Sequence, residues 1–321
     1  MVFQILAFII SCIVLSWLSK SLVATLVQLA KYLKWREFVV GFFVMAFATS
    51  LPNLFVDVNA ALHGMPQLSF GDVVGGNFVD LTLVMALAVI FTRSKKGIPA
   101  KSKMVQMSAF FTAVIAVLPL LLILDGNLDR IDGAILLGSF FVYSFWLFSR
   151  GDNFEKVYRT NKKDQNAMDA FWFLKLALKL ILLLALLMGA SYVIIDTAQF
   201  FAGYLGASLA LIGVLIVGLG NSFPEAYFAI ISAKRGEGWM ILGDLMGSVI
   251  VCSTLVLGIV ALLTPFEIGD FSPFVIARTF TLVAVIFYVF AIRTDKKISK
   301  KEGLFLLFIY ILFLLSEIFI K

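Results

Sequence analysis

The sequence predicts an all-α polytopic membrane protein, with ten transmembrane helices arranged as two inverted five-helix repeats. Three observations support this fold class. Of the 321 residues, 61% are hydrophobic and only 14% are charged, which is far more apolar than a soluble domain. The apolar residues fall into ten long stretches, and a polar, glycine-containing segment of the first half recurs at a fixed distance in the second half.

Each apolar stretch is long enough to cross the roughly 30 Å hydrocarbon core of a bilayer, which takes about 20 helical residues. Together the stretches use nearly the whole chain, so no soluble domain is expected. The predicted spans are 2–30, 36–62, 70–92, 104–124, 131–149, 170–199, 205–233, 240–264, 272–292 and 304–320.

The internal repeat has an offset of 172 residues. The segment GFFVMAFATSLPN from Gly41 aligns without a gap with GVLIVGLGNSFPE from Gly213. Further along, FGDVVGGNFVDLTLV from Phe70 aligns in the same register with LGDLMGSVIVCSTLV from Leu242. Small, polar and helix-breaking residues coincide, which a shared apolar composition does not explain. The identical pairs are Gly41/Gly213, Ser50/Ser222, Pro52/Pro224, Gly64/Gly236, Gly71/Gly243, Asp72/Asp244, Gly75/Gly247 and Thr82/Thr254.

Five spans per repeat is an odd number, so the second repeat enters the membrane from the side opposite to the first. Such repeats are related by a pseudo-twofold axis in the membrane plane, and broken helices of both repeats meet near the midplane to form a binding site. We expect the first repeat at 1–150, a cytoplasmic linker at 151–169 and the second repeat at 170–321.

The basic residues indicate the orientation in the membrane. Twenty of the 26 Lys and Arg residues lie in loops and helix ends on one side, against only Arg130 and Lys321 on the other. The positive-inside rule makes the first side cytoplasmic, which predicts a plasma-membrane protein with both termini outside. Topology thus explains the net charge of +6, and no nucleic-acid partner is implied. The expected partners are the lipid bilayer and inorganic cations, with a monomer as the simplest state.

Two prolines mark the expected helix breaks. Pro52 and Pro224 lie midway along their spans, and each follows small or hydroxylated residues. A proline removes a backbone donor from a helix, and at membrane depth the freed carbonyl groups need protein, water or an ion. One such proline would indicate a simple kink, but two at equivalent positions indicate a pocket.

Two carboxylates are predicted at membrane depth. Asp80 lies within an apolar run, and Glu225 directly follows Pro224. An unpaired charge at the bilayer centre costs about 3 kcal/mol or more, and no cationic side chain in the same segments is an obvious partner. Clustered carboxylates, carboxamides, hydroxyls and backbone carbonyls are the ligands of Ca²⁺ or Na⁺. The sequence therefore predicts a midplane cation site; the alternative is a protonated acid hydrogen-bonded between helices.

The two repeats resemble the alpha-repeats of the sodium/calcium exchanger family of cation/calcium antiporters. That family carries G-T-S-L-P-E followed by G-N-x-x-G-S-N-x-x-N/D. Here the first copy reads FATSLPN from Phe47 and GDVVGGNFVD from Gly71, and the second reads GNSFPE from Gly220 and GDLMGSVIVC from Gly243. The similarity extends over essentially the whole chain.

The resemblance implies an ion pocket with contributions from both repeats. Carried over position by position, it consists of Thr49, Ser50, Asn53, Gly76, Asp80, Asn221, Ser222, Glu225, Ser248 and Cys252. Several positions depart from the family pattern: an acid has become Asn53, an acid or amide has become Cys252, two asparagines have become Asp72 and Asp244, and a serine has become Gly76. Asp57, one helical turn beyond Asn53 on the same face, is either a displaced carboxylate ligand or a side chain facing water in a vestibule. We place Asp72 and Asp244 at the edge of the pocket.

The function that the resemblance implies is secondary active antiport, exchanging Ca²⁺ for Na⁺ by alternating access, with no permanently bound cofactor and no enzymatic activity. A proton-coupled or other-cation exchanger is the main alternative, and a cation channel is a weaker one. The spans 2–30 and 170–199 would slide against the remaining helices. The paired acids Asp72 and Asp244 also suggest an intramembrane aspartyl protease, but their duplication fits a symmetric scaffold better than a catalytic dyad.

The four pocket corners at positions 53, 80, 225 and 252 carry a formal charge of about −2, with Cys252 in its thiol form. One divalent ion, or two monovalent ions, would neutralise it. This count predicts electroneutral exchange.

Overall fold

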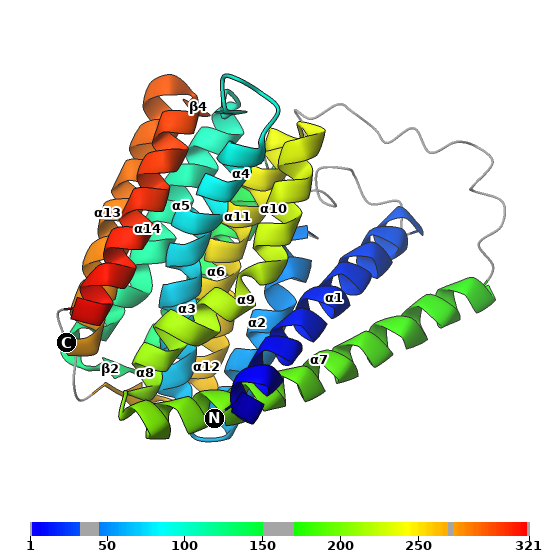
Figure 1. Ribbon diagram of the computed structural model, residues 1–321. Helices are drawn as coiled ribbons and strands as arrows, with labels where there is room; N and C mark the ends of the chain where they lie inside the picture. Colours follow the sequence, from blue (N-terminus) through cyan, green and yellow to red (C-terminus); the bar gives the residue numbers. More distant parts are fainter. Residues whose placement is uncertain (1, 33–44, 150–169, 269–271, 320–321) are drawn as a thin grey trace.

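The computed structural model describes residues 2–32, 45–149, 170–268 and 272–319, which form a bundle of helices (Figure 1). Two long helices, α1 (Val2–Tyr32) and α7 (Ala170–Leu205), lie side by side and cross the flank of the bundle at a slant. The remaining helices stand closer to parallel with one another. The architecture is all-α, as predicted.

The bundle contains corresponding helices from the two halves of the chain. The first half supplies α2 (Met45–Leu62), α3 (Pro66–Val79), α4 (Met85–Phe91), α5 (Lys103–Leu122) and α6 (Arg130–Ser149). The second half supplies α8 (Leu209–Ile212), α9 (Gly218–Asn221), α10 (Phe223–Arg235), α11 (Gly238–Ile250), α12 (Leu257–Leu263), α13 (Ser272–Asp295) and α14 (Lys300–Phe319). These bounds follow the predicted spans closely, although 36–44 of the second span and the linker 151–169 lie outside the described residues.

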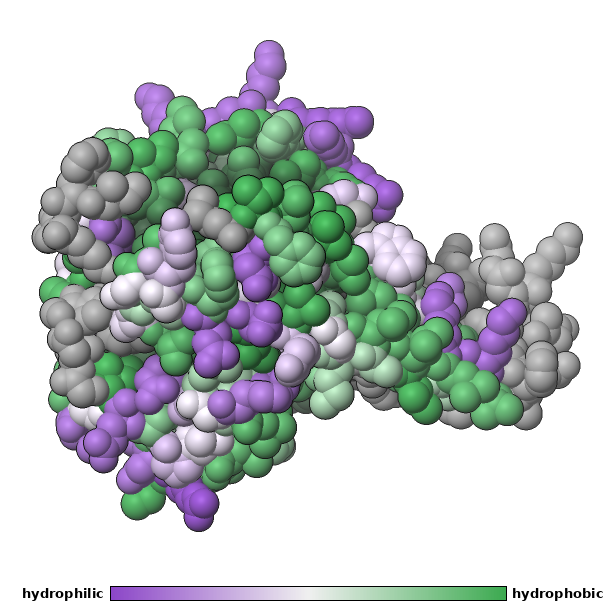
Figure 2. All heavy atoms as spheres, turned by 60° about the horizontal axis from the view of Figure 1, so that its bottom comes forward, coloured by the Kyte–Doolittle hydropathy of each residue, from purple (hydrophilic) through white to green (hydrophobic). Residues whose placement is uncertain are grey.

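The outer surface of the bundle is apolar. Within the described ranges, six helical runs are long and apolar enough to cross a membrane, and a seventh is obtained if the bent pair Gly213–Asn221 and Phe223–Arg235 counts as one span. Figure 2 shows hydrophobic side chains over much of the flank, with hydrophilic side chains gathered towards the ends of the helices. Large apolar residues such as Phe145 and Ile286 are exposed. A bilayer is the solvent that such a surface fits.

The two halves run through the bundle in opposite directions. In Figure 1 the chain rises from α3 to α4 and descends from α11 to α12, although these segments align in sequence at the 172-residue offset. The turns that lead into α3 and α11 also correspond, because Gly64 and Gly236 both adopt left-handed backbone conformations, with φ of 75° and 79°. Glycine suits this conformation because it has no Cβ. The repeats are inverted, as predicted.

Two short antiparallel ladders join loops of the first half to loops of the second. Strand β1 (Ile98–Pro99) pairs with β4 (Lys297–Ile298), and β2 (Asn127–Leu128) pairs with β3 (Phe266–Glu267). The ladders lie at opposite ends of the bundle (Figure 1). They fasten the loops around α4, α5, α6, α12, α13 and α14 to one another.

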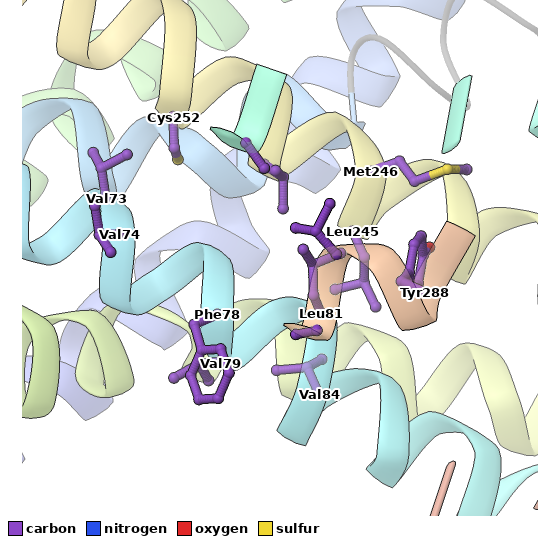
Figure 3. Packing of buried hydrophobic residues seen from close by; sticks show 14 of the residues in the cluster. Val73, Val74, Phe78, Val79, Leu81, Val84, Leu245, Met246, Cys252 and Tyr288 are labelled. Carbon is purple, nitrogen blue, oxygen red and sulfur yellow. The ribbon is translucent and has the colours of Figure 1, made fainter. Parts of the chain in front are cut away.

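The described part of the interior has two large apolar clusters. The larger one joins helices of both halves, and Figure 3 shows part of it, including Phe78 of α3 and Leu245 of α11. The second cluster joins Leu15 and Leu18 of α1 and Ile194 of α7 to Val56 of α2. Among the described residues, α1 and α7 contribute to the second cluster and not to the first. The slanted helix pair therefore packs through an interface of its own.

Glycines allow the two halves to approach at backbone distance. A Cβ added to Gly213 would lie 2.4 Å from the carbonyl oxygen of Leu68, and one added to Gly218 would lie 2.6 Å from the backbone nitrogen of Gly76. Helices associate through such small-residue contacts in membranes, where apolar burial drives little helix association. This contact holds α3 against the chain that leads into α9.

The second predicted helix break is confirmed, whereas the first is not observed. The helices ending at Asn221 and starting at Phe223 meet at an angle of 45°, just before Pro224. In the first half, α2 runs through Pro52 as a continuous helix from Met45 to Leu62. A proline inside a membrane helix removes one backbone hydrogen bond, and neighbouring groups can satisfy the freed carbonyl group without a break in the helix.

Candidate functional site

The predicted pocket residues of both repeats come together in the interior of the bundle. They are supplied by α2, α3, α9, α10 and α11 and by the turns that follow α3 and α11. All of them are buried, and the polar members have at most 7% of their surface exposed. The buried polar members are Thr49, Ser50, Asn53, Asp57, Asp72, Asp80, Asn221, Ser222, Glu225, Asp244, Ser248 and Cys252.

The first pair of contacts crosses between the repeats symmetrically. The hydroxyl of Thr49 donates to Oδ1 of Asp244 at 3.0 Å, and the amide Nδ2 of Asn221 donates to Oδ2 of Asp72 at 2.6 Å. At the 172-residue offset, Thr49 corresponds to Asn221 and Asp72 to Asp244. Each acid is thus held by a neutral donor from the opposite repeat, and Asp72 and Asp244 form part of the buried polar network.

A second pair of contacts follows the same symmetry. The hydroxyl of Ser50 donates to the hydroxyl of Ser248 at 3.3 Å, and the hydroxyl of Ser222 donates to the backbone oxygen of Gly76 at 3.5 Å. Because Gly76 has no hydroxyl, its carbonyl group takes the place that the side chain of Ser248 has in the other repeat. The loss of a serine at position 76 therefore leaves an oxygen at that position.

The symmetry ends at the four corners. Asn53 donates from Nδ2 to the sulfur of Cys252 at 3.3 Å, which gives one neutral pair. The equivalent pair is Asp80 and Glu225, whose carboxyl groups lie close enough to interact electrostatically. Ser248 donates to Oε1 of Glu225 at 3.4 Å. The two corner carboxyl groups thus form one pair, and the amide and the thiol form the other.

Several oxygens of the network have no hydrogen-bond donor. They include Oδ1 of Asp80, Oε2 of Glu225, Oδ2 of Asp244 and Oδ1 of Asn53. In the described part of the chain, the side-chain hydrogen bonds to these carboxylates come from hydroxyl and amide groups. Buried polar atoms are nearly always paired, and burying a charge without a partner is costly. These oxygens can accept either a proton or a cation.

The available ligands favour a hard cation over a transition metal. Across the described ranges, no three acidic, histidine or cysteine side chains converge closely enough to enclose a metal ion. A cation near Asp80 and Glu225 would therefore combine two carboxylates with neutral hydroxyl, amide and carbonyl oxygens. This donor set suits Ca²⁺ and Na⁺.

The backbone beside the pocket is locally widened. The chain passes from α3 to α4 through a π-helical turn, Asp80–Val84, and from α11 to α12 through another, Val251–Val256. The hydroxyls of Thr82 and Thr254 donate to the carbonyl groups of Phe78 and Ile250, at equivalent places. Turns of this kind often occur at functional sites. Here they hold position 80 and position 252 at the pocket.

The structure excludes one of the two alternatives for Asp57 and shows one polar contact that the repeat does not predict. Asp57 has no exposed surface, so it does not face water in a vestibule, and its carboxyl group lies near that of Asp72. The amide of Asn77 donates to the hydroxyl of Ser253 at 2.7 Å between the two repeats. The repeat alignment pairs Asn77 with Val249 and Ser253 with Leu81, so it could not reveal this contact.

An inverted-repeat membrane bundle around a pocket of carboxylate, hydroxyl and amide oxygens defines the class of transporters for inorganic cations. The model of the family described as sodium/calcium exchanger protein matches residues 3–149 and 175–319. The chain belongs to this family, whose members are transporters and not enzymes.

Individual relatives agree with this membership. The sodium/calcium exchanger MaX1 of Methanosarcina acetivorans is 25% identical over 327 residues, which cover 91% of this chain and 92% of the relative. The inner membrane protein YrbG of Escherichia coli is 25% identical over 303 residues, or 88% of each chain. A solved structure of the sodium-calcium exchanger NCX_Mj, soaked with 10 mM Na⁺ and 10 mM Sr²⁺, is similar with a TM-score of 0.68 and 23% identity, covering 98% of both chains. At this identity the structural match shows a shared fold.

Proposed function

We propose that this protein exchanges Ca²⁺ for Na⁺ across the membrane by alternating access at the buried pocket. The observation that carries the proposal is the pairing of Asp80 with Glu225, two fully packed carboxylates that each retain an oxygen without a donor. Their joint charge of −2 matches one divalent ion or two monovalent ions. The name of the Methanosarcina relative supports these two ions as substrates.

The ligands of the transported cation would be the carboxylates of Asp80 and Glu225, with neutral oxygens from the predicted set. That set comprises Thr49, Ser50, Asn53, Asn221, Ser222 and Ser248. Cys252 accepts a hydrogen bond from Asn53 and so forms the uncharged pair of the pocket. Ca²⁺ and Na⁺ would compete for the same oxygens, so that loading one releases the other. No bound cofactor is needed for this cycle.

The moving part would be the pair α1 and α7. Their separate apolar cluster supports sliding against α2, while the two ladders hold the other helices in one body. Sliding would expose the pocket to one side of the membrane and then to the other. Its rim includes Cys12 of α1, which packs against Gly220 at the bend in the pocket.

The orientation follows from the basic loops. Lys95, Lys96 and Lys101 lie between α4 and α5, and Lys296 and Lys297 lie between α13 and α14. We assign this side to the cytoplasm of the cell, with both termini outside and the linker 151–169 inside between the repeats 1–150 and 170–321. The plasma membrane and a monomeric state are part of the same proposal.

Ion-replacement flux in liposomes tests the function. Purified protein is reconstituted with Na⁺ inside, and uptake of radiolabelled Ca²⁺ is measured after dilution into Na⁺, K⁺ or choline medium. Exchange requires that an outward Na⁺ gradient drives uptake and that uptake stops without internal Na⁺. Uptake driven by a pH gradient alone would instead establish a proton-coupled exchanger, and uptake that needs no counter-ion would establish a channel.

A further inference from the structure

A second pair of buried acids lies beside the corner pocket. Asp57 of α2 has no exposed surface, and Asp72 of α3 is 2% exposed. Their carboxyl groups face each other closely enough to interact. Neither side-chain oxygen of Asp57 receives a hydrogen bond, and Oδ1 of Asp72 receives none either.

The carboxamide of Asn221 completes this arrangement from the opposite repeat. Its nitrogen donates to Oδ2 of Asp72, which places the group against the pair, and its oxygen Oδ1 has no partner although Asn221 is only 2% exposed. The hydroxyl of Ser69 donates to the backbone oxygen of Asp57 at 2.8 Å and so ties α3 to the helix that carries the acid. Three separate helices thus hold unpartnered oxygens beside one another.

No positive group among the described contacts offsets the two acids. Besides Asn221 and Ser69, the groups that face them from neighbouring elements include the thiols of Cys12 on α1 and Cys252 in the turn after α11. Neither thiol supplies positive charge. Two carboxylates in contact repel each other strongly where water is excluded, so the pair needs either a shared proton or a cation between its oxygens.

We propose that Asp57, Asp72 and Asn221 form a second cation site, which lies beside the Asp80 and Glu225 corner, shares Asn221 with it and binds a monovalent cation of the Na⁺ class. Two carboxylates and one amide oxygen are too few for Ca²⁺, which takes six to eight oxygen ligands. The inference rests on the proposed function, because it assigns to the exchanger one monovalent ion that the four corners do not hold.

Equilibrium binding to the purified full-length protein tests the site. Radiolabelled Na⁺ and radiolabelled Ca²⁺ are titrated separately against the wild type, Asp57→Asn and Glu225→Gln, with Asp295→Asn at an exposed helix end as the matched control. Asp57→Asn keeps the shape and removes one charge, so we expect about one Na⁺ fewer per chain and unchanged Ca²⁺ binding. Glu225→Gln should lose Ca²⁺ binding, and the control should match the wild type.

An equal number of Na⁺ ions bound by the wild type and Asp57→Asn overturns the second site. If Asp57→Asn does not fold, Asp72→Asn replaces it, since an asparagine there still accepts the bond from Asn221. The two proposals can fail separately. If the wild type binds no Ca²⁺, the exchange function is refuted. If Asp57→Asn binds one Na⁺ fewer than the wild type, the second site is supported whether or not the wild type binds Ca²⁺.

Discussion

Asn221 donates a 2.6 Å hydrogen bond to Asp72 across the boundary between the repeats, and this contact fixes the bend of one repeat to a straight helix of the other. The bend at Ser222 frees backbone groups, so it needs support from outside its own helix. Asp72 provides that support at the point where α9 ends. Contacts between the repeats therefore hold the polar network together.

We expect Glu225→Gln and Asp80→Asn to abolish divalent flux while the protein still folds. Each substitution keeps the shape and removes a charged ligand oxygen from a dry site, which should reduce Ca²⁺ uptake at least tenfold, the equivalent of about 1.4 kcal/mol. The measurement is Na⁺-driven Ca²⁺ uptake into liposomes at matched protein density. Glu267→Gln and Asp295→Asn, at exposed positions, are the controls. Wild-type uptake in both pocket variants would refute the corner assignment.

Asp244→Asn should have a milder effect than Thr49→Val. An asparagine at position 244 still accepts the bond from Thr49 through its side-chain oxygen, whereas valine at position 49 leaves a buried carboxylate without its donor. Loss of a buried partner costs about 1–3 kcal/mol, so thermal unfolding in detergent should show a clearly lower midpoint for Thr49→Val. Equal midpoints for the two variants would show that this bond does not stabilise the site.

Gly220→Ala should slow transport by obstructing α1. An added Cβ would lie 2.9 Å from the sulfur of Cys12 and 3.1 Å from Cζ of Phe8, and these are side-chain atoms of the helix that we propose to slide. The double variant Gly220→Ala with Cys12→Ala should recover part of the flux, which a double-mutant comparison measures.

Two glycines serve as references for that experiment. Gly213→Ala meets backbone at 2.4 Å and should reduce folded yield, with no side chain able to relieve it. Gly138→Ala has open space and should behave as the wild type. If removing the Cys12 sulfur does not improve the flux of Gly220→Ala, the contact with α1 does not limit transport.

Impermeant thiol labelling should confirm the orientation. The native cysteines Cys12 and Cys252 are both buried, so background labelling should be low. Cysteines at Lys96 and Lys301 should react only from the cytoplasmic side of the membrane, and a cysteine at Glu267 only from outside. Intact cells and inverted vesicles provide the two sides. The reverse pattern would overturn the assignment of both termini to the outside.

The reversal point of exchange should depend on voltage. Counting only the four corners gives −2 and electroneutral exchange, but the structure adds Asp57, Asp72 and Asp244 to the same buried network. With one more monovalent ion at the second site, each cycle moves net charge, which couples to the membrane potential by about 2.3 kcal/mol per 100 mV. Liposomes clamped at opposite potentials measure the ion gradients at which net Ca²⁺ flux vanishes.

Asp57→Asn supplies the comparison for the voltage experiment. This substitution should make the reversal point of Ca²⁺ flux independent of voltage, because the extra monovalent ion is lost while the four corner residues remain. A wild-type reversal point that stays fixed at all potentials would show that the second site does not move its ion through the cycle.

Much of the fold and of the pocket could be predicted because the same sequence offset relates the helices and the pocket residues of the two repeats. The 172-residue spacing brings Thr49 and Asn221 to equivalent places, and the structure shows them making equivalent bonds to Asp244 and Asp72. Residues that break the symmetry were harder to place. The neighbour of Asp57 depends on how α2 packs against α3, which hydrophobic spacing does not specify.

The helix breaks show the same limit. Both prolines looked alike in sequence, yet only the second accompanies a bend. What differs is the surrounding structure: the second proline follows shortly after Gly218, which meets the backbone of α3, whereas Pro52 lies inside the continuous helix α2. The local sequence predicted that either proline-containing helix could break, and tertiary packing determined that only the second one does.

The unequal corners have a consequence for the empty carrier. In a transporter built from inverted repeats, the inward-open and outward-open forms are made by the repeats exchanging conformations. Identical repeats would give these two forms equal free energies. Here Asn53 faces Cys252 while Asp80 faces Glu225, so the exchange of conformations does not return the same molecule. We expect the unloaded protein to rest facing one side of the membrane, because the four corner side chains differ between the repeats and give the two forms different free energies.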